Sequence, residues 1–166
     1  SASTGATGQF AKTVWNSILT TEVAKVPVDN GAIGIIEITF DPGRDLYGVW
    51  MNVDRKDALP SSILNFEDKV YKIIEITKSI AFKEGDILNP KINFKILKSW
   101  LSENDLKNND VALFRYTEQW DELNTKFVKE DSEYVYYQSE TPGFSYFIIG
   151  EKEVKKGKFK LKDMDS

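Results

Sequence analysis

The sequence predicts an all-β fold: an antiparallel β-sandwich, immunoglobulin-like or related, with one short helical turn. Three observations predict it. Roughly nine or ten short segments rich in β-branched and aromatic residues recur at spacings of about 8–12 residues, with turn residues between them. Several of these segments alternate apolar and polar residues, which is the period of a strand with one buried face. No long amphipathic helical pattern and no internal repeat is visible in the sequence.

Residues 1–9, "SASTGATGQ", are small and polar, and we expect a flexible lead-in or linker there. A single sandwich domain of residues 10–166 is expected to follow. Its first expected strand is "FAKTVWNSIL" (10–19). This strand is expected to complete the sheet of its own domain and leave the isolated domain monomeric. The alternative is that it adds to a sheet edge of a neighbouring copy, which would make the chain a filament or lattice subunit.

The next two strands are expected on either side of a Pro-Gly turn. "AIGIIEITF" (32–40) is β-branched and apolar, and "DPGRD" (41–45) follows it. We therefore expect a hairpin with "LYGVWMNV" (46–53). Further on, "KVYKIIEITKS" (69–79) mixes alternation with apolar runs, which indicates a strand covered on both faces near its middle.

The clearest alternation in the chain lies in "KINFKIL" (91–97), where Ile92, Phe94 and Ile96 share one face. The period breaks in "KSWLSENDL" (98–106), where we expect the short helical turn. Ser99 or Ser102 is the expected N-cap, because a hydroxyl oxygen there can accept a free backbone N–H.

The rest of the chain is expected to form strands within residues 111–120, 121–130, 133–139, 144–150 and 158–163. Pro142 and Gly143 are expected at the two central positions of a type II turn, because Pro142 fixes its φ and Gly143 tolerates a positive φ. Glu140 to Gly143 would then link two of these strands. These two strands are unusually aromatic. One aromatic row is expected in the core, and the other at the surface.

Composition excludes several kinds of site. The 166 residues include no cysteine and no histidine, which rules out disulfides, zinc–thiolate sites and catalysis by cysteine or histidine. The net charge of −4 argues against binding to nucleic acid. No apolar run approaches the roughly 18 residues of a membrane span. We expect no cofactor and no enzymatic activity; the alternative is a hydrolase using two carboxylates from Asp41, Asp45 and Asp54.

Three blocks of the sequence resemble the archaeal PGF-pre-PGF domain. They are "INFKILKSWL" (92–101), "VALFRYTEQWDELNT" (111–125) and "YVYYQSETPGFSYFIIGEK" (134–152). The resemblance is good over about residues 65–152 and loose over residues 10–64. The residues of this chain that carry the family pattern most clearly are Phe94, Trp100, Arg115, Tyr116, Trp120, Leu123, Thr141, Pro142, Gly143, Phe144 and Ser145.

The resemblance implies a non-catalytic structural or interaction module of an archaeal surface protein, located outside the cell, at the cell surface or in the envelope. It implies other surface proteins, or other domains of the same parent chain, as partners. Family members often precede a C-terminal sorting signal that also contains Pro-Gly-Phe, followed by an apolar anchor. Residues 151–166 contain no apolar run, so Pro142 to Phe144 is interpreted as the internal motif.

Two interpretations of the aromatic residues remain open. The motif residues Trp100, Arg115, Tyr116 and Trp120 are expected to pack in or against the core, where Arg115 can stack on Trp120 as a cation–π pair. In the alternative they form a ligand face. A carbohydrate-binding module is the alternative function, with Tyr136 and Tyr146 as its exposed aromatic face and a glycan as its ligand.

Overall fold

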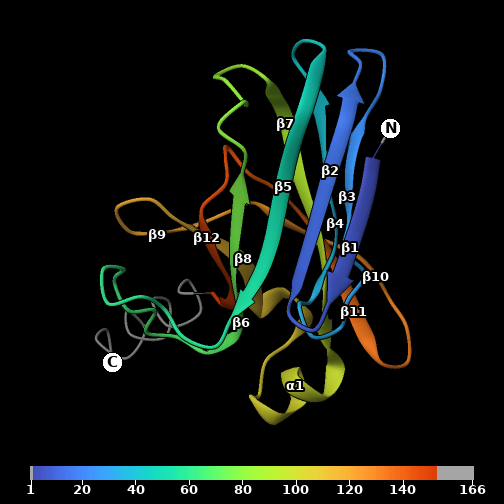
Figure 1. The fold of residues 1–166 in the computed structure, drawn as a ribbon. Helices are drawn as coiled ribbons and strands as arrows, with labels where there is room; N and C mark the ends of the chain where they lie inside the picture. Colours follow the sequence, from blue (N-terminus) through green and yellow to red (C-terminus); the bar gives the residue numbers. More distant parts are fainter. Residues whose placement is uncertain (1, 153–166) are drawn as a thin grey trace.

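The computed structural model describes residues 2–152, which form two antiparallel sheets packed face to face (Figure 1). The expected all-β sandwich is confirmed. The seven-stranded sheet has the order β1 (Ala2–Thr7), β2 (Phe10–Ile18), β5 (Leu46–Lys56), β6 (Val70–Lys78), β12 (Tyr146–Glu151), β8 (Val111–Tyr116) and β9 (Trp120–Glu122). The five-stranded sheet has the order β10 (Thr125–Glu130), β11 (Tyr134–Glu140), β7 (Ile87–Leu97), β4 (Ile35–Pro42) and β3 (Ala24–Pro27).

The core lies between the two sheets and follows the alternation in the sequence. On β7, Ile92, Phe94 and Ile96 are fully buried, as expected. The neighbouring β11 turns Val135 and Tyr137 to the same interior, and the rings of Phe94 and Tyr137 stack with their centroids 5.2 Å apart. Alternating apolar residues on both sheets thus exclude water from one continuous layer.

Strand β6 is covered on both faces, as its mixed pattern indicates. Ile74 and Ile76 are buried in the main core, whereas Val70 and Ile73 pack in a second apolar cluster on the opposite face. Leu59 and Phe66, from the long connection between β5 and β6, belong to this second cluster. The connection 57–69 therefore covers part of the outer face of the seven-stranded sheet.

The expectation of a flexible lead-in over residues 1–9 is wrong. Ala2–Thr7 form β1, which pairs with β2 in an uninterrupted antiparallel register. Small polar residues suit an edge strand that is exposed to solvent, so composition alone does not separate such a strand from a linker. Strand β2 pairs with both β1 and β5, and it buries Ala11, Trp15 and Ile18 in its own core. In this structure the strand thus completes its own sheet.

Neither expected Pro-Gly hairpin forms. Strands β4 and β5, which flank Pro42 and Gly43, lie in different sheets, and so do β11 and β12, which flank Pro142 and Gly143. Each Pro-Gly segment therefore carries the chain across the sandwich. The type II turn is also wrong, because Gly143 is not among the glycines with positive φ.

The helical turn is present as α1 (Lys98–Glu103), and a short 3₁₀ turn (Asn108–Asp110) precedes β8. Leu97 is the N-cap of α1 and makes no side-chain capping bond, so the expected serine caps are wrong. Together these turns carry the chain from the five-stranded sheet to the seven-stranded sheet. The strand expected at 158–163 lies outside the described residues.

Candidate functional site

Four connections between the sheets gather at one end of the sandwich, opposite α1 (Figure 1). We call this the crossover end. The register places them together, because Ile18 pairs with Leu46 across the seven-stranded sheet and Pro42 pairs with Ile87 across the five-stranded sheet. The four connections are residues 19–23, 43–45, 79–86 and 141–145.

Residues 141–145, which begin with the Thr-Pro-Gly motif, form the last of these crossovers. The hydroxyl groups of Thr141 and Ser145 both bond to the backbone. Buried Thr141 donates its hydroxyl to the carbonyl oxygen of Gly143 at 2.6 Å, and its N–H bonds to the carbonyl of Pro90 at 3.1 Å. Ser145 donates its hydroxyl to the carbonyl oxygen of Tyr116. The motif thus ties the crossover to β7 on one side and to β8 on the other.

Arg115 reaches from β8 to the same crossover. A Cβ atom added to Gly143 would lie 2.8 Å from Nη2 of Arg115, so the end of this side chain packs directly against the glycine. The Nε atom of Arg115 is buried and has no hydrogen-bond partner within the described residues. The expected cation–π pair with Trp120 is absent from the described contacts, where only lysines lie over aromatic rings.

Tyr116 and Trp120 instead hold the connection 57–69 onto the sheet. Trp120 donates its indole N–H to the carbonyl of Leu64 at 2.8 Å, and the N–H of Leu64 bonds to the hydroxyl of Tyr116 at 3.2 Å. The rings of Trp120 and Phe66 meet edge to face, 5.8 Å apart. These contacts favour packing over a ligand face for both residues.

The remaining aromatic and aliphatic motif residues pack on the main core. Trp100 on α1 meets the ring of Tyr71 at 5.0 Å, and Leu123 and Phe144 are partly buried against the cluster between the sheets. Phe94 lies fully inside that cluster. The motif residues therefore come from four regions of the chain, and most of them connect one layer of the fold to another.

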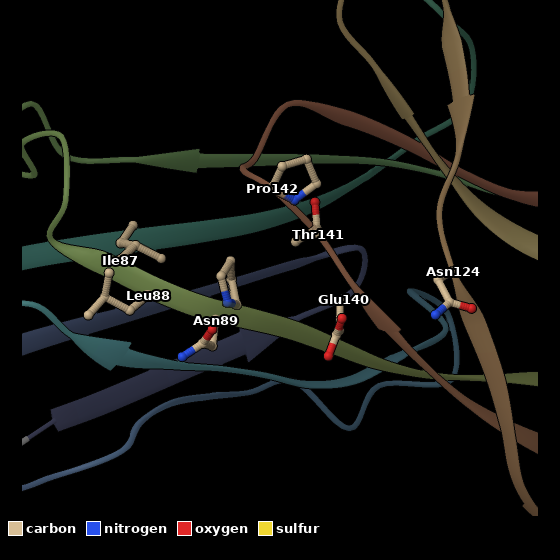
Figure 2. Close-up of a pocket in the computed structure, with 8 residues that line it drawn as sticks. Ile87, Leu88, Asn89, Asn124, Glu140, Thr141 and Pro142 are labelled. Carbon is tan, nitrogen blue, oxygen red and sulfur yellow. The ribbon is translucent and has the colours of Figure 1, made fainter.

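Pro142 forms the wall of two hollows at the crossover end, which the sequence did not indicate. The larger has a volume of about 510 Å³ and places Leu88 and Asn89 of β7 on one side and Asn124 on the other (Figure 2). Asn89 adopts a left-handed φ of 51°, at an irregularity in the pairing of β7 with β4. The smaller hollow, of about 180 Å³, lies beside Gly143 and Lys83.

The structure does not bring the two candidate tyrosines together. Tyr136 lies on β11, on the outer face of the five-stranded sheet, because its neighbour Tyr137 points inward. Tyr146 lies on β12 in the other sheet, opposite Glu75 and outward from buried Phe147. The expected aromatic face made of Tyr136 and Tyr146 is therefore not formed.

Tyr136 has Tyr134 as its aromatic neighbour, with ring centroids 6.3 Å apart. Lys95 Nζ lies 4.3 Å above the ring of Tyr134, and Lys129 Nζ lies 4.8 Å above the ring of Tyr136. The hydroxyl of Tyr136 donates to Asp131 at 2.7 Å. The backbone N–H of Tyr134, followed by this hydroxyl, lowers the pKa of Asp131 to about 2.

A row of amide groups continues this outer face. Gln138 donates to the side-chain oxygen of Asn93 at 2.9 Å, and Asn93 donates to Glu37 at 3.4 Å. The three side chains come from β11, β7 and β4, which are adjacent strands. We call Tyr134, Tyr136, Gln138, Asn93 and Glu37 the tyrosine–amide face; it offers aromatic carbon beside hydrogen-bonding groups.

The three candidate carboxylates, Asp41, Asp45 and Asp54, each have a different partner. Asp41 accepts a bond from Asn89 at 3.4 Å, Asp45 accepts the N–H of Thr20 at 2.8 Å, and Asp54 pairs with Lys56 at 3.0 Å. This arrangement favours local structural roles for them.

A scan against protein-family models finds no match to this sequence, and a search of curated proteins finds no similar protein. Among residues 2–152, no group of three or more Asp and Glu side chains is placed to hold a metal ion. The described helices are too short to cross a membrane.

Proposed function

We propose that this chain is a non-catalytic structural or interaction module of an archaeal cell-surface protein. The proposal rests on the hydrogen bonds that the motif residues make within the fold. Thr141 and Ser145, the two hydroxyl groups of the Thr-Pro-Gly-Phe-Ser segment, both donate to backbone carbonyls. A hydroxyl that donates to a backbone carbonyl in this way positions the chain, whereas a nucleophilic hydroxyl donates to an activating base.

The placement at the cell surface rests on the resemblance of the three sequence blocks to the archaeal PGF-pre-PGF domain. The same resemblance supports other surface proteins, or other domains of the parent chain, as partners. The net charge of −4 disfavours nucleic acid as a partner, because phosphate binding needs a basic face.

Labelling of intact cells tests this location. Antibodies against residues 2–152 are expected to bind intact cells of the source organism, and external protease is expected to remove the epitope. A cytoplasmic protein serves as the control that stays protected. An epitope that becomes accessible only after lysis would contradict a surface location.

The absence of catalysis is tested on the purified chain. Panels of polysaccharide, peptide and ester substrates are expected to show no turnover above a heat-denatured control. Turnover that persists through purification and falls in an Asp41, Asp45 or Asp54 variant would favour the hydrolase instead.

Glycan binding is a second candidate, favoured by the tyrosine–amide face. Tyr134 and Tyr136 provide ring carbon, and Gln138 and Asn93 provide amides of the kind that bond to sugar hydroxyls. Binding on a glycan array should then disappear in Tyr136→Ala and persist in Tyr146→Ala, since Tyr146 lies on the other sheet. Equal loss in both variants would argue against this face.

A further inference from the structure

Three of the four sheet edges carry features that oppose pairing with another strand. Strand β3 contains Lys25 and Pro27, and proline has no N–H to offer to a neighbour. Strand β10 has a register break between Phe127 and Lys129 and carries lysines. Strand β9 is only three residues long. Charges, proline, bulges and short length are the usual means by which proteins protect an exposed edge.

The fourth edge, β1, has none of these features. Its six residues, "ASTGAT", include no charged residue and no proline. Its pairing with β2 runs without a break from Ala2 opposite Trp15 to Thr7 opposite Phe10. The side chains are all small, so another strand can approach the edge closely. This is the edge best suited to accept a further strand.

The register identifies which backbone groups of β1 are free. Thr7 and Phe10 close a two-residue turn, and the closing pair of such a turn exchanges two backbone hydrogen bonds. Since hydrogen-bonded and non-bonded pairs alternate, Gly5 and Ser3 also bond to β2. The N–H and C=O groups of Ala2, Thr4 and Ala6 then point away from β2, along the open edge.

Side-chain contacts anchor β1 from the inner side. The hydroxyl oxygen of Thr4 lies 2.8 Å from that of Thr13, which is fully buried on β2. This bond does not involve the backbone N–H and C=O of Thr4, which by the register point along the open edge. Strand β1 is therefore held in place with its outer row of hydrogen-bonding groups exposed.

We propose that β1 is a homodimerisation edge. It pairs antiparallel with β1 of a second copy, and the two Thr4 residues face each other across the twofold axis. In this register Ala2 of each copy lies opposite Ala6 of the other, and each facing pair exchanges two hydrogen bonds. The two seven-stranded sheets become one continuous sheet. The dimer departs from the monomer expected from the sequence, and it is independent of the proposed cell-surface role.

A second copy is the occupant that fits this edge best. The segment carries no charge, so its pairing with itself brings no like charges together, in contrast to β10 with its lysines. The segment is also short enough for a weak, reversible contact. A twofold contact uses the same surface on both copies and closes on itself, so it produces dimers, whereas a head-to-tail contact produces filaments.

Sedimentation equilibrium over about 10 µM to 1 mM tests the edge. Thr4→Pro removes an outward N–H from each copy at the dyad, and Thr4→Val removes the same hydroxyl while keeping the N–H. We expect the wild type and Thr4→Val to dimerise with similar affinity, and Thr4→Pro to bind at least about tenfold more weakly. A wild type that is monomeric throughout, or a Thr4→Pro variant that dimerises as well as Thr4→Val, would overturn the proposal.

Single cysteines test the register, because the chain has no cysteine of its own. In the proposed dimer the Cα atoms of the two Thr4 residues are about 5.5 Å apart, which a disulfide can span. The two Ser3 residues are offset by two positions and lie beyond the limit of about 7 Å. Mild oxidation should therefore link Thr4→Cys efficiently and Ser3→Cys poorly. Equal linking of the Thr4→Cys and Ser3→Cys variants would overturn the register. A dimer in which β1 is exchanged onto the partner's β2 would also overturn it, and in that case Thr4→Cys would stay unlinked.

Discussion

The chain crosses between its sheets at two Pro-Gly segments, and the two glycines pack against different kinds of neighbour. Pro42 and Gly43 lead from β4 to β5, and Pro142 and Gly143 lead from β11 to β12. A Cβ on Gly43 would lie 2.0 Å from the backbone oxygen of Gly85, whereas a Cβ on Gly143 would lie 2.8 Å from the end of the Arg115 side chain. The same dipeptide is thus fixed in one place by rigid backbone and in the other by a side chain that can move.

The largest expected effect is that of Gly43→Ala. The methyl group would overlap the carbonyl of Gly85, and the N–H of Gly43 also bonds to the carbonyl of Asp86 at 2.9 Å, so the two connections must separate. We expect the free energy of unfolding to fall by about 3 kcal/mol or more, at the upper end of the usual cost of overpacking. Urea denaturation followed by tryptophan fluorescence measures it.

Gly5→Ala is the matched control for that substitution, because nothing lies within 4 Å of a Cβ built at Gly5. We expect its free energy of unfolding to stay within about 0.5 kcal/mol of the wild type. A Gly43→Ala variant as stable as Gly5→Ala would show that the crossover can relax around the added methyl group.

The second prediction concerns Asp86, which holds the Gly43 crossover in place. Asp86 is 3% exposed; its carboxylate accepts two bonds from Arg44, at 2.8 and 3.1 Å, and one from the N–H of Lys83 at 2.7 Å. Asp86→Asn weakens the bonds to Arg44 and places an amide where an acceptor is needed. We expect a loss of about 2 kcal/mol in the free energy of unfolding, measured at pH 7.

The contribution of Asp86 to the stability of the fold is expected to depend on pH. The hydrogen bond from Arg44, with that from Lys83, lowers the pKa of the Asp86 carboxyl in the folded protein. Its contribution to stability is therefore complete above the ordinary pKa of an aspartate and is lost as the pH falls through the lowered value. The gap in stability between wild type and Asp86→Asn should narrow on acidification. A constant gap from pH 7 to pH 2 would show that the charge of Asp86 is not what stabilises the crossover.

The third prediction concerns the second crossover. Thr141 is 5% exposed, and its hydroxyl donates to the carbonyl of Gly143 at 2.6 Å. Thr141→Val keeps the shape and removes the donor. We expect a loss of about 1–2 kcal/mol, because the carbonyl is left without that partner. Thermal unfolding measures this loss of stability. Thr125→Val, which removes a part-buried hydroxyl bond at the start of β10, is the comparison. A neutral Thr141→Val would mean that water replaces the hydroxyl.

The sequence predicts the strands well because their period is local. Ile92, Phe94 and Ile96 alternate with polar residues, and each is fully buried. The inward direction of Tyr137 and Phe147 also follows from period two. For the same reason the helical turn at Trp100 is visible as a break in that period.

Which strands are neighbours is not a local property, and here the sequence prediction fails. Pro-Gly fixes that the chain turns, but β11 pairs with β10, which directly precedes it, and with the more distant β7, and not with β12, which follows the turn. The aromatic face of Tyr136 and Tyr146 fails with the hairpin, since both depended on β11 pairing with β12. The large hollow beside Pro142 is lined by three separate segments, so no single stretch of sequence indicates it.

The smallest expected effect is that of Gly143→Ala, and it tests the comparison between the crossovers most directly. The nearest atoms to the added methyl group all belong to the Arg115 side chain, whose buried Nε atom has no hydrogen-bond partner within residues 2–152. The guanidinium can therefore move aside, and we expect a loss of about 1 kcal/mol. In an Arg115→Ala background the obstacle is gone, so the same substitution should cost almost nothing. A double-mutant cycle of Gly143→Ala and Arg115→Ala measures this coupling by denaturant unfolding. If Gly143→Ala costs the same in both backgrounds, the backbone around Gly143 is the constraint, and the two Pro-Gly crossovers are alike after all.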